Sequence, residues 1–388
     1  MSARGRALGL LSLAPVCSMT TWFSATAVVP QLREEWELGD TAAAWLTIAV
    51  QVGFVAGALA SSAVTLADVF PPRAVILAGS LGAAAANALL LVADGPGVGL
   101  VARAATGFCL AGVYPPALKL ASTWFQRGRG TALGIVVGAL TLGSAAPHLV
   151  NGLGGLDWQI VVVTTSVLTV AGGVVAAVAV PEGPFRFPTA RFDPRQAPRV
   201  LANRGVRLAS LGYFGHMWEL YAMWAWFLVF FSAVATDGRG AAYATFAVIG
   251  VGALGCWAGG VLGDRWGRPE TTAAMMAVSG VCAVVVGVVG AWSAAAALAV
   301  GLVWGFAVVA DSAQFSTLVT ELADQAYVGT ALALQLAVGF ALTVATIWLV
   351  PYWEDAVGWE WAFAFLAPGP ALGILAMLRL RRLANQVP

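Results

Sequence analysis

Glycine, proline and clusters of charged residues divide this chain into twelve apolar stretches. Each is about as long as a helix that crosses a bilayer, which needs about 20 mostly apolar residues. Strands of an open sheet are excluded, because lipid cannot satisfy unpaired backbone groups at a sheet edge. The pattern predicts an all-α integral membrane protein with twelve transmembrane helices. The expected spans are 7–31, 41–63, 74–93, 97–121, 130–152, 158–180, 208–234, 240–262, 271–292, 294–318, 328–350 and 359–379.

Charged residues are scarce, at 10% of the 388 residues. Soluble proteins have roughly 25%, so this chain cannot cover a soluble surface and the lipid bilayer is its expected surrounding. The net charge of +1 gives no sign of a nucleic-acid partner. The sequence has no phosphate-binding Walker loop, so no cofactor is expected.

A short motif recurs half a chain apart. Gly260-x-x-x-Asp264-Arg265-x-Gly267-Arg268 follows the eighth span, and Asp68 with Arg73 forms a less complete copy 196 residues earlier (264 − 68). Nearly constant offsets of this kind predict two pseudo-symmetric halves of six helices, related by an axis along the membrane normal. Three further pairs support the repeat: Gly130-Thr131-Ala132-Leu133 with Gly329-Thr330-Ala331-Leu332, Gly107-Phe108 with Gly305-Phe306, and Trp22 with Trp218.

The stretch 181–207 separates the expected halves, 1–180 and 208–388. It is rich in proline and arginine, which stop helices and resist the bilayer. We expect a cytoplasmic linker there, with room for a short surface helix. Positively charged loops stay on the cytoplasmic side, and with the N-terminus inside only Arg33 and Arg239 fall outside. The sequence thus predicts cytoplasmic termini, in the inner membrane of a bacterium.

Taken together, the chain resembles the major facilitator superfamily over nearly its whole length. The Asp264 motif is similar to the family's loop motif between helices two and three and helices eight and nine; its first copy has Val64 and Val69 where glycine and arginine are usual. Arg103-x-x-x-Gly107 resembles the family's helix-four motif. A weak further likeness is to small-anion porters of the cyanate and nitrate type. The resemblance implies a transporter whose helices one, four, seven and ten surround a central cavity.

Ionisable residues inside a span are functional candidates, because a charge there is costly unless it is paired or hydrated. Glu219 lies near the middle of the seventh span, with His216 on the same helix face and Trp218 beside it. We expect Glu219 to take up and release the coupling proton, with His216 and Trp218 contacting substrate. The alternative is that Glu219 pairs with His216 or with an arginine and only locks helices together.

Arg103 lies in the fourth span and keeps its charge at any physiological pH. Its planar fork suits the oxygens of a carboxylate or a nitrate-like anion. One interpretation therefore gives Arg103 a substrate or coupling contact. The other makes it structural, with its donors on backbone carbonyls.

Asp311 lies in the inner half of the tenth span, with Gln314 on the same face. In the fourth span Tyr114 precedes two prolines, which should kink that helix. One interpretation makes Asp311 a second proton-coupling carboxylate and gives Gln314 and Tyr114 substrate contacts. The other pairs Asp311 with Lys119.

Thr21 and Trp22 belong to a polar patch at mid-depth in the first span. They offer hydrogen bonds and an aromatic wall to a substrate. Packing between small residues of neighbouring helices explains the same composition.

The loop motifs suggest gates. Asp264 can accept hydrogen bonds from the start of a neighbouring helix, and Arg265 and Arg268 can bridge to Asp324 or Glu321. Positive loops that merely set the topology are the alternative. The gating candidates are Asp68, Arg73, Asp264, Arg265 and Arg268.

These features predict a secondary transporter and not an enzyme. It would move a small anionic or zwitterionic solute by proton-coupled alternating access, with proton symport as the expected direction, and act as a monomer. The alternative within transport is proton-driven efflux of organic cations or drugs. A membrane receptor or enzyme is the alternative of another class.

Overall fold

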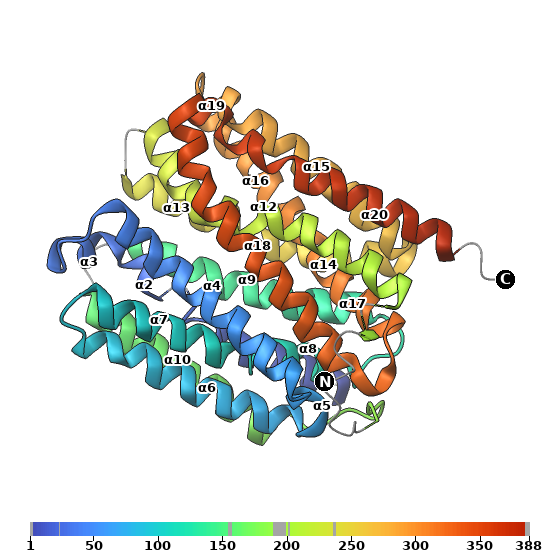
Figure 1. The fold of residues 1–388 in the computed structure, drawn as a ribbon. Helices are drawn as coiled ribbons and strands as arrows, with labels where there is room; N and C mark the ends of the chain where they lie inside the picture. Colours follow the sequence, from blue (N-terminus) through green and yellow to red (C-terminus); the bar gives the residue numbers. More distant parts are fainter. Residues whose placement is uncertain are drawn as a thin grey trace. The chain divides into compact units, whose positions relative to one another are not determined.

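The structure, a computed structural model, describes residues 3–22, 24–153, 157–188, 199–200, 202–235 and 238–384. Within these residues the chain forms helices and turns and no strand (Figure 1). Eleven of the described helical segments are long and apolar enough to span a membrane. The all-α membrane architecture expected from the apolar stretches is confirmed.

The helices pack into two compact units. Unit 1 comprises 1–126, 146–200 and 324–341, and unit 2 comprises 127–145, 201–323 and 342–388. The expected division into 1–180, a linker at 181–207 and 208–388 stays a prediction. Residues 189–198 and 201, where a surface helix has room, lie outside the described residues.

The helices of unit 1 are α1 (Ala3–Ser18), α2 (Ser24–Ala27), α3 (Val29–Glu35), α4 (Asp40–Ala63), α5 (Leu66–Val69), α6 (Pro72–Ala88), η1 (Leu89–Val92), α7 (Pro96–Leu110), α8 (Tyr114–Ser122), α10 (Trp158–Ala179) and η2 (Gln325–Tyr327). Those of unit 2 are α12 (Arg204–Val234), α13 (Gly238–Gly250), α14 (Gly252–Trp266), α15 (Arg268–Gly290), α16 (Ala294–Ala310), α17 (Ser312–Leu322), α19 (Trp359–Ala362), η3 (Phe363–Leu366) and α20 (Pro368–Ala384). Two helices are divided between the units: α9 (Arg129–Leu153) begins in unit 2 and α18 (Val328–Val357) begins in unit 1.

Both units pack their helices in the same order. In unit 1, α4 packs on α7, α6 on α7 and α10, and α1 on α10; in unit 2, α14 packs on α16, α15 on α16 and α20, and α12 on α20. A Cβ on Gly107 would lie 1.9 Å from the carbonyl oxygen of Val50, and one on Gly305 would lie 1.8 Å from that of Val248. Only glycine allows backbones this close, so the same device recurs 198 residues on. The pseudo-symmetric repeat expected from the sequence is confirmed.

The prediction of one continuous first span, 7–31, is wrong. α1 ends at Ser18, a turn follows through Trp22, and the short helices α2 and α3 continue the chain. The 16 residues of α1 cover about 24 Å, less than the roughly 30 Å of a hydrocarbon core. A break at this depth is tolerated only where other groups satisfy the freed backbone, and a buried arginine does so here.

The fourth and tenth spans are also broken. α7 ends at Leu110 and α8 begins at Tyr114, directly before Pro115 and Pro116, so the kink expected from the double proline is present. α16 ends at Ala310 and α17 begins at Ser312, with no proline at the junction. Asp311 lies at this second break.

Candidate functional site

Asp264, at the end of α14, receives the first free N–H groups of α9. Its carboxylate accepts hydrogen bonds from Gly130 N (3.2 Å), Thr131 N (2.8 Å) and Thr131 Oγ1 (2.7 Å). The unpaired N–H groups and positive dipole end of a helix favour a negative charge. We name Asp264, Gly130, Thr131 and Arg268 the Asp264 latch. The expected contact between Asp264 and the start of a neighbouring helix is present.

Asp68, in α5, makes the same contact with α18. It accepts from Gly329 N (3.0 Å), Thr330 N (2.7 Å) and Thr330 Oγ1 (2.8 Å). Both latches therefore pair the aspartate of one loop motif with a Gly-Thr pair at a helix start. We name Asp68, Gly329, Thr330 and Lys119 the Asp68 latch.

Arg268 supplies the countercharge of the Asp264 latch. Its guanidinium lies 3.0 Å from Asp264 and donates to Glu321 at 2.8 and 2.9 Å and to Gln314 Oε1 at 3.1 Å. Of the two acids expected to bridge here, Glu321 does so, whereas Asp324 accepts from Ala326 N within its own turn. Gln314, three residues from Asp311, thus contacts the Asp264 latch through Arg268. Its contact with a substrate stays a prediction.

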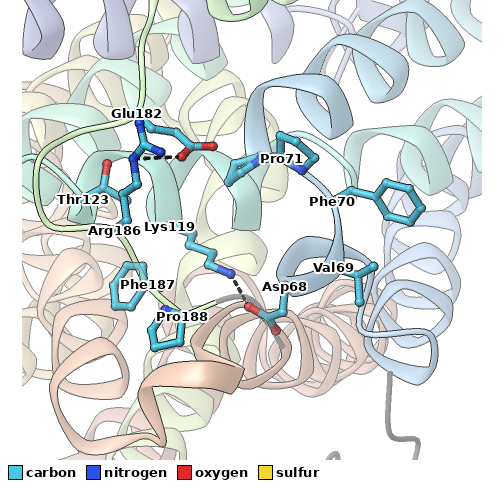
Figure 2. Close-up of a pocket in the computed structure, with 11 residues that line it drawn as sticks. Asp68, Val69, Phe70, Pro71, Lys119, Thr123, Glu182, Arg186, Phe187 and Pro188 are labelled. Atoms are coloured by element: carbon cyan, nitrogen blue, oxygen red, sulfur yellow. Dashed lines mark hydrogen bonds and ion pairs between the residues drawn. The ribbon is translucent and has the colours of Figure 1, made fainter. Parts of the chain in front are cut away.

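Lys119 supplies the countercharge of the Asp68 latch (Figure 2). Its ammonium pairs with the Asp68 carboxylate and donates to the carbonyl oxygen of Ala67 at 2.9 Å. The alternative that paired Lys119 with Asp311 is wrong, because Lys119 pairs with Asp68 and Asp311 pairs with His216. Arg73 and Arg265, the remaining gating candidates, are exposed to the surroundings.

Glu219 forms a buried cluster with two neutral donors in unit 2. Trp304 Nε1, from α16, donates to its Oε1 at 2.7 Å, and Ser279 Oγ, from α15, donates to its Oε2 at 2.9 Å. The residue is 1% exposed. The alternative pairing of Glu219 with His216 or an arginine is wrong, since its carboxyl oxygens are held by an indole and a hydroxyl group.

His216 and Asp311 form a second buried pair in unit 2. His216 Nδ1 lies 2.9 Å from Asp311 Oδ1, and each residue is 1% exposed. His216 Nε2 is buried and has no hydrogen-bond partner among the described residues. The pair joins the seventh span to the break in the tenth, so the break that has no proline carries a carboxyl group and a neighbouring imidazole.

Two further substrate candidates are Trp218, which is partly buried, and Tyr114, which is buried. Trp218 Nε1 donates to the carbonyl oxygen of Phe365 at 3.3 Å, in unit 2. Tyr114 is buried at the start of α8, in unit 1. Their contact with a substrate stays a prediction.

Arg103 has its donors on the broken first span. It donates to the carbonyl oxygens of Thr21 (2.8 Å), Trp22 and Leu46 (3.2 Å) and to Ser24 Oγ (3.2 Å), and it is fully buried. These contacts satisfy the carbonyls that the break in the first span frees. They favour the structural interpretation of Arg103, and its contact with a substrate anion stays a prediction.

Trp22 lies in an aromatic cluster of unit 1. Its ring is 5.2 Å from that of Phe54 and 5.1 Å from that of Phe340, and the latter two are 4.5 Å apart. Thr21 Oγ1 accepts from Thr169 at 3.4 Å, so it contributes to packing against α10. The cluster links the first span to α4 and α18.

Replacing Arg268 by alanine is expected to loosen the Asp264 latch, because Asp264 and Glu321 then lose their shared cation. A cysteine at Ala132, which is buried two residues into the latched helix end, should react about fivefold faster with an impermeant maleimide, a modest change that suits a partly exposed network. Arg265→Ala is the matched control, since Arg265 is the exposed neighbour. Equal labelling of the two variants would deny Arg268 this role.

Three comparisons relate this geometry to known proteins. The family model of the Major Facilitator Superfamily matches residues 11–346. The puromycin resistance protein pur8 of Streptomyces alboniger is 34% identical over 136 residues, a stretch that covers 34% of this chain and 26% of that relative. The crystal structure of the human organic anion transporter MFSD10 (TETRAN) superposes with a TM-score of 0.79 at 14% identity, over 97% of this chain and 100% of that one.

The family match spans most of the chain, and the structural neighbour shares its fold. The chain therefore belongs to the major facilitator superfamily, a family of membrane transporters for small molecules and not of enzymes.

Proposed function

We propose that this protein exports small organic cations in exchange for protons, by alternating access, as a monomer in a bacterial inner membrane with both termini in the cytoplasm. The observation that carries the proposal is the Glu219 cluster, a buried carboxyl group whose two donors are both neutral. Such a group tolerates burial when it carries a proton and attracts a cation when it does not. Glu219 is thus suited to hold either a proton or a positively charged solute, one at a time.

The buried charged residues that already have partners indicate the class of substrate. Arg103, the main reason to expect an anionic solute, directs its donors to backbone carbonyls and a serine. Unit 2 instead has two buried carboxyl groups, Glu219 and Asp311, with His216 beside the second. This balance favours a cation. The relative from Streptomyces alboniger is named for resistance to puromycin, an amine-bearing compound, and this supports the same class.

The proposal is tested with purified protein in proteoliposomes that carry an imposed pH gradient. Puromycin and tetraphenylphosphonium serve as cation probes, and nitrate and p-aminohippurate as anion probes. We expect gradient-driven movement of a cation probe against the proton flow, and none of the anions. Accumulation of an anion together with protons would replace this proposal with the symport of anions that Arg103 suggested from the sequence.

A further inference from the structure

The two latches hold corresponding aspartates with different countercharges. α8 begins at Tyr114 and α17 at Ser312, so the 198-residue offset seen at Gly107 and Gly305 continues through both helices. In this register Thr123 corresponds to Glu321. The lysine that pairs with Asp68 therefore has no basic counterpart in α17, where Thr317 stands.

The first half also lacks an arginine at the position of Arg268, and Arg73, one position further on, is exposed. Asp68 and Asp264 are 196 residues apart, and the same offset places Pro72 where Arg268 stands. Both partners of the Asp264 network, the arginine and the glutamate, are therefore missing from the first half. Lys119 lies one helical turn before Thr123. It brings a cation to the aspartate from α8 and not from the start of α6.

Burial makes this cation more important than its counterpart. The Asp68 side chain is 0% exposed and that of Lys119 6%, whereas Asp264 and Arg268 are 17% and 14% exposed. Water can replace part of what Arg268 gives to Asp264. A buried carboxylate that loses its paired cation keeps the whole desolvation penalty.

The segment Pro181–Pro188 covers the Asp68–Lys119 pair. Gly183 N donates to Thr123 Oγ1 at 2.8 Å, and Phe185 N donates to the Thr123 carbonyl oxygen at 2.9 Å. The ring of Phe187 lies 5.9 Å from Lys119 Nζ, and Figure 2 shows Phe187 and Pro188 beside the pair. Thr123, at the position of the missing glutamate, thus anchors a segment that lies beside the pair, and Thr123, Phe187 and Pro188 line a pocket of about 130 Å³ together with Asp68 and Lys119.

We propose that Lys119 is a gating residue that replaces the arginine missing from the first half, and that Phe187 seals its ion pair in the latched state. The proposal rests on the alternating access proposed above. Lys119 stabilises the latched state because it neutralises Asp68 where solvent cannot. When α18 leaves Asp68, water reaches the carboxylate and takes over part of the neutralisation. Lys119 therefore acts through Asp68 and not on the solute.

A double-mutant cycle tests whether Lys119 acts through charge. A cysteine at Ala331, buried beside Thr330, reports release of α18 through its reaction with an impermeant maleimide, read by mass spectrometry of its peptide. Lys119→Met should raise the reaction rate about tenfold, because it strands a buried charge. Adding Asp68→Asn should bring the rate back to within about threefold of the parent, because the stranded charge is gone while one acceptor for α18 remains.

The conservative variant Lys119→Arg should label like the parent, which shows that a cation at this position is sufficient. If Lys119→Met labels like the parent, or if the double variant labels as fast as the single one, then Lys119 only fills space and the proposal is overturned. Thermal unfolding of each variant identifies a chain that fails to fold. If a variant does not fold, the rate of acetylation of Lys119 in the parent protein tests the proposal instead.

Lys119 is the single lysine of the chain, so its amine can be followed directly. Acetylation by sulfo-N-hydroxysuccinimide acetate should be at least about tenfold slower at Lys119 than at the N-terminal amine, which serves as the internal reference. Phe187→Ala should raise the rate at Lys119 about tenfold, whereas Phe185→Ala, which leaves the backbone anchor and the lysine contact in place, should not. Rapid acetylation of Lys119 in the parent, or equal effects of the two variants, would overturn the proposal that Phe187 seals the ion pair. This readout needs no solute, so the export proposal can fail while the gating role of Lys119 holds.

Discussion

Glu219→Gln is expected to abolish both the proton-driven accumulation of a cation probe and its exchange without a gradient, because the neutral amide can hold neither a proton nor a cation. Glutamine has nearly the same size, and its carbonyl oxygen can still accept from Trp304 Nε1, so the packing of α12 against α16 is kept. It cannot bind or release a proton at physiological pH. We expect gradient-driven transport of a cation probe to fall about a hundredfold, in line with the loss of an essential proton-transfer group.

The measurement compares accumulation with counterflow in the same proteoliposomes. Counterflow needs the solute to bind and cross but no net proton movement, so its loss in Glu219→Gln would show that the carboxylate holds the cation as well as the proton. Glu360→Gln is the matched control, because Glu360 is an exposed carboxylate whose replacement should change neither quantity. Undiminished accumulation by Glu219→Gln would exclude Glu219 as the coupling group. His216 and Asp311 would then be the next pair to test.

Arg103→Ala is expected to destabilise the protein itself. The change removes a fully buried cation together with its hydrogen bonds to the carbonyls of Thr21, Trp22 and Leu46. A buried acceptor that is left without a donor costs about 1–3 kcal/mol, and several acceptors are affected here. We therefore expect a marked fall in the thermal unfolding midpoint of the purified protein, together with loss of transport for every solute.

Arg103→Lys should recover only part of this stability, because one ammonium group cannot reach the several acceptors that the planar fork serves. Arg73→Ala, at an exposed arginine of the same unit, is the control and should leave the midpoint unchanged. An Arg103→Ala protein of parental stability that has lost only anion transport would restore the substrate interpretation of this residue.

The architecture could be predicted from the sequence because a bilayer imposes it locally. Span length, each copy of the loop motif, and the double proline at Pro115 and Pro116 are all determined by residues that are adjacent in the sequence. The break in the first span could not be predicted this way, since the stretch is apolar enough to cross. What breaks it is Arg103, about 80 residues further on, whose donors stabilise a turn that lipid would otherwise forbid.

Partners of the buried charges were harder to predict than the charges themselves. Glu219, His216 and Asp311 stand out because ionisable residues are rare in spans, but helical spacing suggested a pair within α12. The observed partners, Ser279, Trp304 and Asp311, come from other helices. The loop motif predicts Asp68 as a gating residue but not the cation that pairs with it, because Lys119 lies outside the motif. The gating role that we propose for Lys119 depends on the comparison of α8 with α17.

The reciprocal latches also set an order of events while the chain is being made. Asp264 is synthesised after its helix start, since Thr131 precedes it by 133 residues. Asp68 must wait for Thr330, 262 residues later, which takes about 13 to 50 s at the usual 5–20 residues per second. Lys119 follows Asp68 by only 51 residues, so it reaches the ribosomal exit within the first fifth of that delay. The nascent first half thus has a cation for Asp68 long before α18 is made, whereas the helix start that holds Asp264 already exists when Asp264 is synthesised.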